Sequence, residues 1–442
     1  VDMIWEGKDD LLPSLRRFSE WIQFYADKYE KDEKIVTHLE AKKCQHCEFK
    51  VDEDQESSGF KSGFKECWKN TLKWGDDDFE KPNIFELWNS RKKQTFMDNG
   101  KYFLADLTEE DIGIKPATNI GLSTTERQWL QVEKIKTNDK SVYFDKIGFE
   151  GELRKWEWPL HFIDFETTAV AIPFNKGRRP YEGVAFQFSH HTMYEDGSIE
   201  HKGEFINTER GIFPNFEFIR ALKAELEEDN GSIFRYAPHE NTYLNIIYDQ
   251  LTVSNEPDKA ILCKWIKTIT KSRKDSVEQW EGKRNMIDML ELIKKFYYNP
   301  FMKGSNSIKA VLPAVLNSSG FLQKKYCKPV YGKGNKINSL NFDPDRVWIK
   351  KDEQGYIINP YKLLPSIFDD IDQQELENFI TDPKLADGGA AMTAYAKMQF
   401  TEMSDIERDH IIEGLLKYCE LDTFAMVMIM EELINLCSRR RL

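Results

Sequence analysis

The amino-acid sequence predicts an α/β fold from about residue 151 onward, preceded by a mainly helical region. Two observations support this prediction. Residues 183–193 alternate between apolar and polar positions, and a second strand-like run covers 199–206 after the turn residues Glu195 to Gly197, which together indicate a β-hairpin. Beyond the hairpin, short strand-like runs alternate with amphipathic helical segments, and this alternation is typical of α/β proteins.

The region before residue 151 carries apolar residues at three- and four-residue spacings, which predict helices. We expect helices over residues 11–29, 83–99 and 122–130, and a short helix that starts within 107–112 with Thr108 as its N-cap. On this basis residues 1–75 form a helical segment that contains cysteines, and residues 76–150 form a helical connector.

The region from 151 to 442 begins with an apolar run at residues 160–163 that predicts a buried strand. Further elements follow the hairpin in order. We predict a strand at 232–237, a less regular segment at 328–360, and helices over 215–228, 240–251, 259–270, from 307 onward, and 404–436. Within 286–296, a helix is expected to follow the run from Ile287 to Leu290.

The overall composition restricts the possible classes of protein. The chain has 442 residues, of which 40% are hydrophobic and 13% aromatic, so an ordered globular protein is expected. The net charge of −13 is not the global signature of a nucleic-acid binder, but a local basic channel is compatible with it. Seven cysteines, an odd and sparse set, favour a reducing cytoplasm, and neither a membrane span nor a signal peptide is visible.

Two acidic side chains follow the first predicted strand directly. These are Asp164 and Glu166, and positions i and i+2 of a strand point to the same side of a sheet. Two neighbouring acids on a buried face are unfavourable unless a positive group lies between them, and a divalent metal ion meets that need. A strand end with two solvated acids is the alternative.

Other acids occupy similar positions later in the chain. Glu240 begins a predicted helix, where the helix dipole favours an anionic group. Tyr418 and Asp422 are at positions i and i+4 of the last predicted helix and therefore share a face. Asp288 precedes another helix, and we interpret it as a helix cap. Each acid taken alone also fits an ordinary helix-terminal or salt-bridged role.

Together, Asp164, Glu166, Glu240 and Asp422 suit a site for two Mg²⁺ or Mn²⁺ ions. Hard divalent cations prefer oxygen ligands, and two such ions about 3.5–4 Å apart are a common arrangement for cleaving phosphodiesters. Tyr418 is suited to orient the attacking water or to receive its proton. These residues predict a two-metal phosphodiesterase.

The order of these motifs resembles that of the DEDD exonucleases of the ribonuclease H-like superfamily, in the tyrosine-containing (DEDDy) subclass. The resemblance implies a ribonuclease H-like mixed sheet flanked by helices over residues 151–442. It also implies that the four acids bind the two ions, that Tyr418 positions the nucleophilic water, and that 5′-mononucleotides are released from a 3′ end. Glu240 departs from the pattern, because most of the superfamily has Asp there.

A closer resemblance is to a bacterial family of uncharacterised proteins with this nuclease-like domain. A glutamate in the second motif is usual in that family. The resemblance also implies that the N-terminal region is the end of a module similar to iron–sulfur PD-(D/E)XK nucleases, so that the chain, which begins at Val1, lacks the start of that module. It rests on residues 159–168, 173–189, 304–309, 387–391 and 418–426.

Three cysteines form a second candidate metal site. Cys44 and Cys47 have C-x-x-C spacing and Cys67 follows nearby, so their thiolates are suited to bind one ion. His38 and His46 are candidates for a fourth ligand of Zn²⁺, whereas a cysteine in a missing N-terminal segment would suit a [4Fe–4S] cluster. Three buried free cysteines are the alternative reading.

Basic residues near these motifs are candidates for contacts with nucleic acid. Lys176, Arg178 and Arg179 form a basic loop after the first motif, suited to phosphate contacts. Lys303 and Lys309 flank a Gly–Ser turn that contains Ser305 and is suited to hold a phosphate with backbone N–H groups. Phe165 or Tyr181 is suited to stack on a terminal base. Solvated surface charges and core aromatics are the alternative.

These observations predict a metal-dependent 3′–5′ exonuclease that acts on single-stranded 3′ ends of DNA or RNA. A different class remains open, namely a catalytically weak nucleic-acid-binding or scaffolding protein that keeps the nuclease fold, since Glu240 is longer than the usual Asp. The residues do not choose between DNA and RNA, and they identify no protein partner.

Overall fold

The computed structural model describes residues 18–33, 38–51, 53–364 and 389–438. The chain divides into two compact units. Unit 1 consists of Val1–Ile114 and Gln128–Asp139, and unit 2 consists of Lys115–Arg127 and Lys140–Leu442. This division differs from the predicted boundaries at residues 75 and 150, because residues on both sides of position 75 contribute to one hydrophobic core in unit 1.

Unit 1 is built from short helices around an aromatic core. Phe64 and Trp68 stack on each other with their ring centroids 5.2 Å apart, and both are buried together with Ile84, Leu87 and Leu104. The elements of this unit are α1 (Phe18–Glu30), α2 (Ala41–Gln45), α3 (Glu53–Ser57), α4 (Gly63–Leu72), α5 (Asp76–Phe79), η1 (Ile84–Glu86), α6 (Lys93–Asp98), η2 (Leu104–Asp106) and α7 (Glu109–Ile112).

The predicted helix over residues 83–99 is wrong, because this segment forms the separate elements η1 and α6. Asn89 adopts a left-handed backbone conformation with φ of 49°, which ends any helix. The N–H of Trp88 donates to Gln131 Oε1 at 3.1 Å, so a side chain replaces the helical acceptor. The Thr108 cap is confirmed, since its hydroxyl accepts from the N–H of Asp111. Of the predicted helix at 11–29, residues 11–17 lie outside the described residues.

Unit 2 contains a mixed sheet with helices on both faces. Its elements include α8 (Thr124–Lys136), through which the division between the units runs. They continue with β1 (Tyr143–Phe144), α9 (Lys146–Leu153), β2 (Leu160–Thr168), β3 (Val184–Met193), β4 (Ile199–Ile206), α10 (Asn215–Leu226), β5 (Ile233–Arg235), α11 (His239–Thr252), α12 (Lys259–Ile269), β6 (Ile287–Asp288), α13 (Met289–Phe296) and β7 (Tyr297–Tyr298). The last part holds η3 (Pro300–Met302), α14 (Ile308–Ser318), α15 (Gly320–Tyr326), β8 (Tyr331–Gly332), β9 (Ile337–Asn338), η4 (Pro360–Leu363), α17 (Gly389–Phe400) and α18 (Asp405–Ser438).

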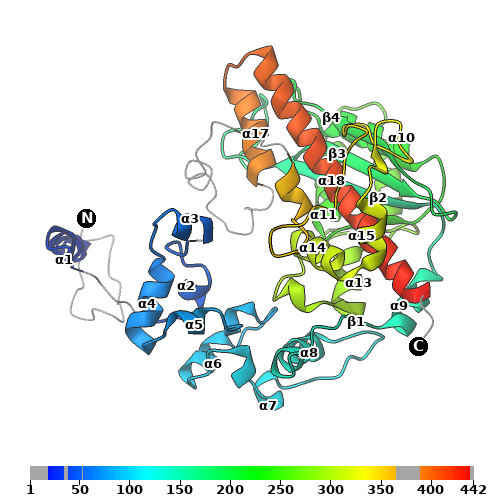
Figure 1. Ribbon diagram of the computed structural model, residues 1–442. Helices are drawn as coiled ribbons and strands as arrows, with labels where there is room; N and C mark the ends of the chain where they lie inside the picture. Colours follow the sequence, from blue (N-terminus) through cyan, green and yellow to red (C-terminus); the bar gives the residue numbers. More distant parts are fainter. Residues whose placement is uncertain (1–17, 34–37, 52, 365–388, 439–442) are drawn as a thin grey trace. The chain divides into compact units, whose positions relative to one another are not determined.

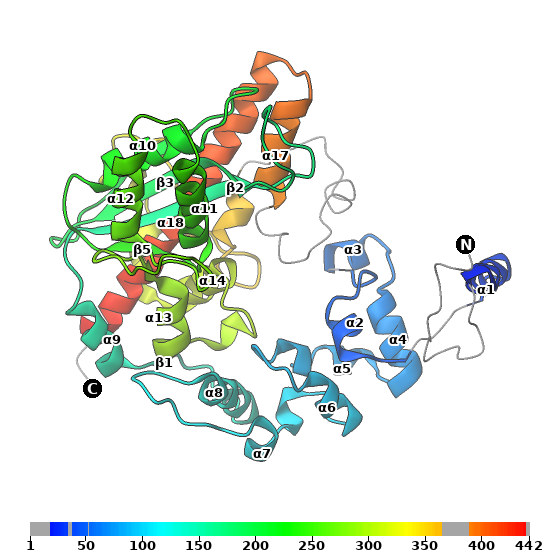
Figure 2. The ribbon, with the colours of Figure 1, turned by 180° about the vertical axis from the view of Figure 1, so that it is seen from behind.

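The main sheet has the strand order β6-β5-β2-β3-β4-β9-β8. Strand β3 runs antiparallel to β2 and to β4, whereas β5 runs parallel to β2 and β6 parallel to β5. Figure 1 shows α18 crossing one face of this sheet, and Figure 2 shows α10, α11 and α12 covering the other. Strand β2 separates two cores, since Phe162 packs on the α18 side and Ile163 on the α10–α12 side.

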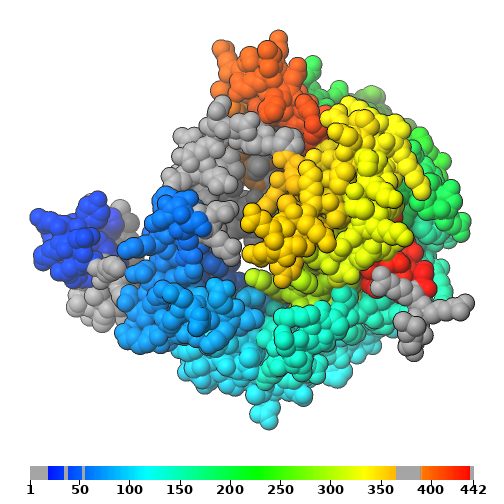
Figure 3. Space-filling view, viewed as in Figure 1, coloured from blue at the N-terminus to red at the C-terminus, as the bar shows by residue number. Residues whose placement is uncertain are grey.

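The long helix α18 is buried through most of its second half. Every residue from Cys419 to Met430 is buried, so this part of the helix lies inside the protein with its polar as well as its apolar side chains. The segment after α14 packs over the second half of α18, and in Figure 3 its yellow atoms leave only a small red patch of that helix in view. Within this segment, β8 and β9 extend the sheet, which sequence periodicity did not predict because two-residue strands carry no repeat.

The predicted hairpin is confirmed. The N–H of Tyr194 donates to Ser198 O at 2.9 Å, and Gly197 adopts a φ of 82° at the turn. The predicted helices after it are present with ends shifted by a few residues, and the predicted last helix corresponds to α18. The structure adds α9, α15 and α17, none of which we predicted. None of the helices that the structure describes has both the length and the apolar character needed to cross a bilayer.

Candidate functional site

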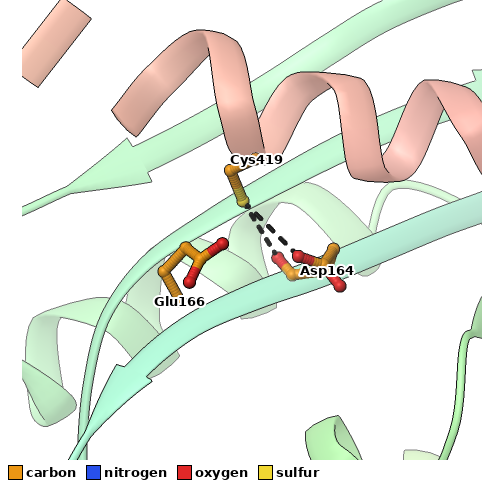
Figure 4. A group of neighbouring side chains, drawn as sticks. All are labelled: Asp164, Glu166 and Cys419. Atoms are coloured by element: carbon orange, nitrogen blue, oxygen red, sulfur yellow. Dashed lines mark hydrogen bonds between the residues drawn. The ribbon is translucent and has the colours of Figure 1, made fainter. Parts of the chain in front are cut away.

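Strand β2 presents Asp164 and Glu166 to the face of the sheet that α18 covers. Asp164 lies opposite Ser189 of β3 and Glu166 opposite Gln187, and the pairing of β2 with β3 shifts just after Glu166. Figure 4 shows both carboxylates on this strand, with Cys419 of α18 pointing toward them. The spacing of two residues thus places the carboxylates on one face, as the sequence predicted.

A tight turn brings Glu240 to the same site. After β5, Ala237 adopts a left-handed conformation with φ of 77°, and α11 then begins at His239. Asp288 stabilises the turn, because its carboxylate accepts from the N–H of Ala237 at 3.0 Å and from the guanidinium of Arg235 at 2.9 Å. The same carboxylate accepts from the N–H of Leu290 as the N-cap of α13, which confirms the predicted cap.

Helix α18 supplies Tyr418 and Asp422, and buried polar contacts hold the helix on the sheet. The hydroxyl of Thr423 lies 2.8 Å from Ser189 Oγ and 2.7 Å from His191 Nδ1. The buried carboxylate of Glu420 accepts from the Tyr331 and Ser339 hydroxyls, and it lies 3.2 Å from His201 Nδ1. These contacts determine the rotation of α18 and therefore the direction in which Asp422 points.

All five predicted catalytic residues line one cleft in unit 2. Its volume is about 270 Å³, and its walls come from β2, α11, α14, α17 and α18. The lining residues are Asp164, Phe165, Glu166, Thr167, Tyr236, His239, Glu240, Ser307, Ile308, Lys309, Met392, Tyr418 and Asp422. The structure therefore brings together residues that are more than 250 positions apart in the sequence.

Burial and mutual repulsion disfavour the charged forms of these acids. Burial, followed by repulsion from Asp422 and other nearby acids, raises the pKa of Asp164 and that of Glu166 well above their usual values, while Lys309 opposes both shifts. Burial raises the pKa of Glu240 to about 8. Acids with raised pKa values keep their protons at neutral pH. A bound divalent cation stabilises the ionised form of such a cluster.

The donor set fits hard divalent ions. Within the described residues, Glu240 Oε2 is buried and has no hydrogen-bond partner. A buried carboxylate oxygen without a partner is costly, and coordination to a cation removes that cost. Carboxylate oxygens are the ligands that Mg²⁺ and Mn²⁺ prefer. Asp164, Glu166, Glu240 and Asp422 are thus the residues suited to hold such ions.

Sequence reasoning missed Tyr361 at this site. Its hydroxyl donates to Asp422 Oδ1, and its ring lies 6.1 Å from that of Tyr418. The ammonium group of Lys309 lies 5.1 Å from the centre of the Tyr418 ring and 5.5 Å from that of Tyr361. Tyr361 belongs to η4 in the irregular segment, where no periodicity or motif distinguishes it from a surface tyrosine.

The predicted contacts with nucleic acid separate into two groups. Lys309, in the first turn of α14, lines the cleft, and Lys303 and Ser305 lie in the loop before that helix without lining the cleft. Arg178 is engaged locally, because it pairs with Glu182 at 3.3 Å and lies 3.4 Å from the centre of the Phe213 ring. The structure therefore does not bring Arg178 to the cleft.

The remaining predicted contacts also lie apart from the cleft, with one exception. Lys176 and Arg179 are exposed and do not line it. Tyr181 is 71% exposed and likewise does not line it. Phe165 does line the cleft, but only 3% of it is exposed and its ring packs edge-on against Phe218. Base stacking on Phe165 is therefore incompatible with its packing.

The three N-terminal cysteines line one cavity in unit 1. Cys44 and Cys47 lie at the end of α2 and just after it, and Cys67 lies on α4; each is an unpaired thiol. The cavity has a volume of about 610 Å³, and His38 and His46 also line it. Burial raises the pKa of the Cys44 thiol, whereas the indole of Trp68 acts to lower this pKa. Three thiols with histidines beside them suit Zn²⁺ or an iron–sulfur cluster.

Comparison with known proteins yields one match. Residues 161–307 match the model of a family described as a domain of unknown function, DUF2779. This stretch contains Asp164, Glu166 and Glu240 but ends before Tyr418 and Asp422. No curated protein and no solved structure matches the chain.

Proposed function

We propose that this protein is a two-metal-dependent 3′–5′ exonuclease of the DEDDy type that acts on single-stranded DNA or RNA. One observation carries the proposal. Four carboxylates from β2, α11 and α18 converge on a single cleft, together with Tyr418. The raised pKa values of Asp164, Glu166 and Glu240 favour a cationic occupant over an ordinary surface role.

The topology of unit 2 supports a ribonuclease H-like fold. In that fold, a three-stranded antiparallel meander is followed by two strands that run parallel to the first strand and extend the sheet on its other side. Strands β4-β3-β2-β5-β6 follow this order, with β3 antiparallel to its neighbours. The first strand of such a sheet and a late helix contribute the metal-binding acids in the DEDD exonucleases, which agrees with the positions of Asp164 and Asp422.

The side chains have separate tasks in the proposed reaction. When bound, the divalent ions polarise the scissile phosphate and lower the pKa of a water molecule. Asp164, Glu166, Glu240 and Asp422 would hold the ions, with the side chains of Glu166, Glu240 and Asp422 buried in the wall of the cleft. The hydroxyl of Tyr418 orients the attacking water. Tyr361 holds the Asp422 carboxylate in one orientation through its hydrogen bond.

Lys309 is suited to the phosphate of the substrate. Its ammonium group lies beside the rings of Tyr418 and Tyr361 at the wall of the cleft, and its charge opposes the upward pKa shifts of Asp164 and Glu166. A cation in this position balances the negative charge that a phosphodiester brings into the cleft. Two other proposed nucleic-acid contacts, Lys303 and Ser305, lie in the loop before α14, the helix that carries Lys309.

The proposal is tested with a single-stranded oligonucleotide labelled at its 3′ end, in DNA and RNA forms. With Mg²⁺ or Mn²⁺ we expect release of labelled mononucleotide, and chelation of the ions stops it. Asp164→Asn and Asp422→Asn each remove a proposed ligand and are expected to lower the rate about 10³-fold. Glu195→Gln, an exposed acid at the hairpin turn, is the matched control and retains the rate.

A binding or scaffolding role is the competing interpretation. A second measurement distinguishes this role from the proposed nuclease activity. Calorimetry with Mn²⁺ counts the ions that the cleft binds. Two bound ions together with nucleotide release support the enzyme. Oligonucleotide binding without release, at saturating Mn²⁺, would contradict the proposal and favour the scaffold.

We also propose a metal ion at Cys44, Cys47 and Cys67, either Zn²⁺ or a [4Fe–4S] cluster, and a location in the reducing cytoplasm. All seven cysteines are unpaired thiols, which supports a reducing compartment. Elemental analysis and the visible absorbance of the anaerobically purified protein distinguish zinc from the cluster. Protein with neither metal would contradict the proposal for this site.

A further inference from the structure

Cys419 brings a sulfur atom to the carboxylate pair of β2. Its thiol donates to the backbone oxygen of Asp164 at 3.6 Å and to the Asp164 carboxylate at 3.8 Å. Ligand atoms of Asp164, Glu166 and Cys419 all lie within 4.8 Å of one another. Figure 4 shows that the three side chains converge from two elements, β2 and α18.

The carboxylate of Glu166 points into this group without an internal partner. Glu166 is only 6% exposed, and within the described part of the chain no group donates a hydrogen bond to its carboxylate. A nearby cation would stabilise the ionised form of a carboxylate this deeply buried. The site thus combines a carboxylate that receives no hydrogen bond from the described residues with a thiol at ligand distance.

The distances agree with the coordination geometry of a thiophilic ion. In a tetrahedral zinc site, bonds of about 2.3 Å to sulfur and 2.1 Å to oxygen place these two ligand atoms about 3.6 Å apart. The observed separation of Cys419 Sγ from the Asp164 carboxylate oxygen is 3.8 Å. An ion therefore fits between the two atoms with little movement of either chain segment.

We propose that Asp164, Glu166 and Cys419 form a binding site for a thiophilic divalent cation such as Zn²⁺ or Cd²⁺, and that occupation of this site inhibits the reaction. Coordination replaces the thiol proton, which passes to solvent, by a sulfur–metal bond. Mg²⁺ does not use this sulfur, because hard ions bind oxygen ligands in octahedral geometry. Zn²⁺ held here withdraws Asp164 and Glu166 from their proposed task. The proposed inhibition by Zn²⁺ rests on the proposed nuclease function, whereas the proposed binding of the cation does not.

Binding is tested by NMR of the cadmium nucleus in the full-length protein loaded with Cd²⁺. The chemical shift of a cadmium resonance reports how many sulfur atoms coordinate the ion. The resonance of a site with one sulfur ligand is therefore distinguishable from that of a site formed by Cys44, Cys47 and Cys67. We expect a one-sulfur resonance in the wild type. It disappears in Cys419→Ser and in Asp164→Asn, and it persists in Cys327→Ser, where an exposed cysteine serves as the matched control.

Asp164→Asn removes a carboxylate ligand of the site and leaves the Cys419 thiol in place. It therefore tests the assignment of the resonance even if Cys419→Ser folds poorly. Thermal melting of each variant shows whether it is folded. A wild-type spectrum without a one-sulfur resonance overturns the inference, as does a resonance that persists in folded Cys419→Ser.

Inhibition is tested separately on the Mg²⁺-supported reaction, with each variant compared with its own rate before Zn²⁺ is added. The zinc concentration that halves the rate is expected to be at least about tenfold higher in Cys419→Ser than in the wild type, since the sulfur ligand is lost. Equal sensitivity overturns the inhibitory role. A one-sulfur resonance in a protein without nuclease activity supports the site and contradicts the proposed function.

Discussion

The carboxylate cleft takes its side chains from β2, α11 and α18, whereas the cysteine cavity takes its three thiols from residues 44–67 alone. The cleft is built on a sheet and a long buried helix. Buried hydrogen bonds of Glu420 and Thr423 fix the position of this helix on the sheet. The cavity stands on α2 and α4, which have five and ten residues. Helices this short are marginal by themselves.

The two proposed metal sites would therefore depend on their surroundings in different ways. The fold of unit 2 assembles the acids against their mutual repulsion, so the site depends on a scaffold with a large core. The thiols of unit 1 are close in sequence and need little scaffold, so a bound ion is expected to contribute to folding there.

Loss of the ion at the cysteines is expected to unfold this part of unit 1. A structural Zn²⁺ contributes on the order of 10 kcal/mol of apparent folding free energy in small domains. Cys44→Ser and Cys47→Ser should therefore abolish hydrogen-exchange protection in α4, while protection in α18 is unchanged. Cys327→Ser is the control. Full protection of α4 in metal-free Cys44→Ser would contradict the expectation that a bound ion contributes to folding in unit 1.

Glu420→Ala should destabilise unit 2 more than any single change at the cleft acids. It removes a buried carboxylate that the Tyr331 and Ser339 hydroxyls and His201 surround, so these groups lose their partner. We expect a decrease of about 3–5 kcal/mol in the free energy of unfolding. Glu413→Gln, an exposed acid on the same helix, should change it by less than about 0.5 kcal/mol. Chemical denaturation with a probe in unit 2 measures both.

The stabilisation of unit 2 by Mn²⁺ should increase with pH. The pKa of Glu240 is about 8 in the ion-free fold and near 4.5 in the unfolded chain, so the protonated form favours folding. The ion-free fold therefore loses stability as the pH rises from 4.5 toward 8, and the ion replaces the lost protons. The difference in melting temperature with and without Mn²⁺ should grow across this range. A constant difference would show that the acids do not bind the ion.

Tyr361→Phe should weaken metal binding without disturbing the fold. It removes the hydrogen bond to Asp422 Oδ1 but keeps the ring beside Tyr418 and Lys309. The loss of a group that orients a metal ligand commonly lowers affinity by 10- to 100-fold, and we expect about tenfold here. Calorimetric titration with Mn²⁺ measures the change. Tyr356→Phe, an exposed tyrosine of the same segment, is the matched control.

Local features of this protein were predictable from short stretches of its sequence. The spacing of Asp164 and Glu166 on a strand, and of Tyr418 and Asp422 on a helix, placed each pair on one face because the side-chain periods of strands and helices are fixed. The hairpin, the Thr108 cap and the Asp288 cap were predictable for the same reason, since each depends on a few consecutive residues.

Which of these features come together in space depends on long-range packing. Glu240 reaches the cleft because Asp288, distant in sequence, holds the turn before α11. Tyr361 and Cys419 join the acids through packing, and pairing with Glu182 keeps Arg178 apart from the cleft. A hydrogen bond from Trp88 to Gln131 interrupts the predicted helix at 83–99. Such contacts join residues far apart in the chain, and no local period encodes them, because their energy exists only once the core has formed.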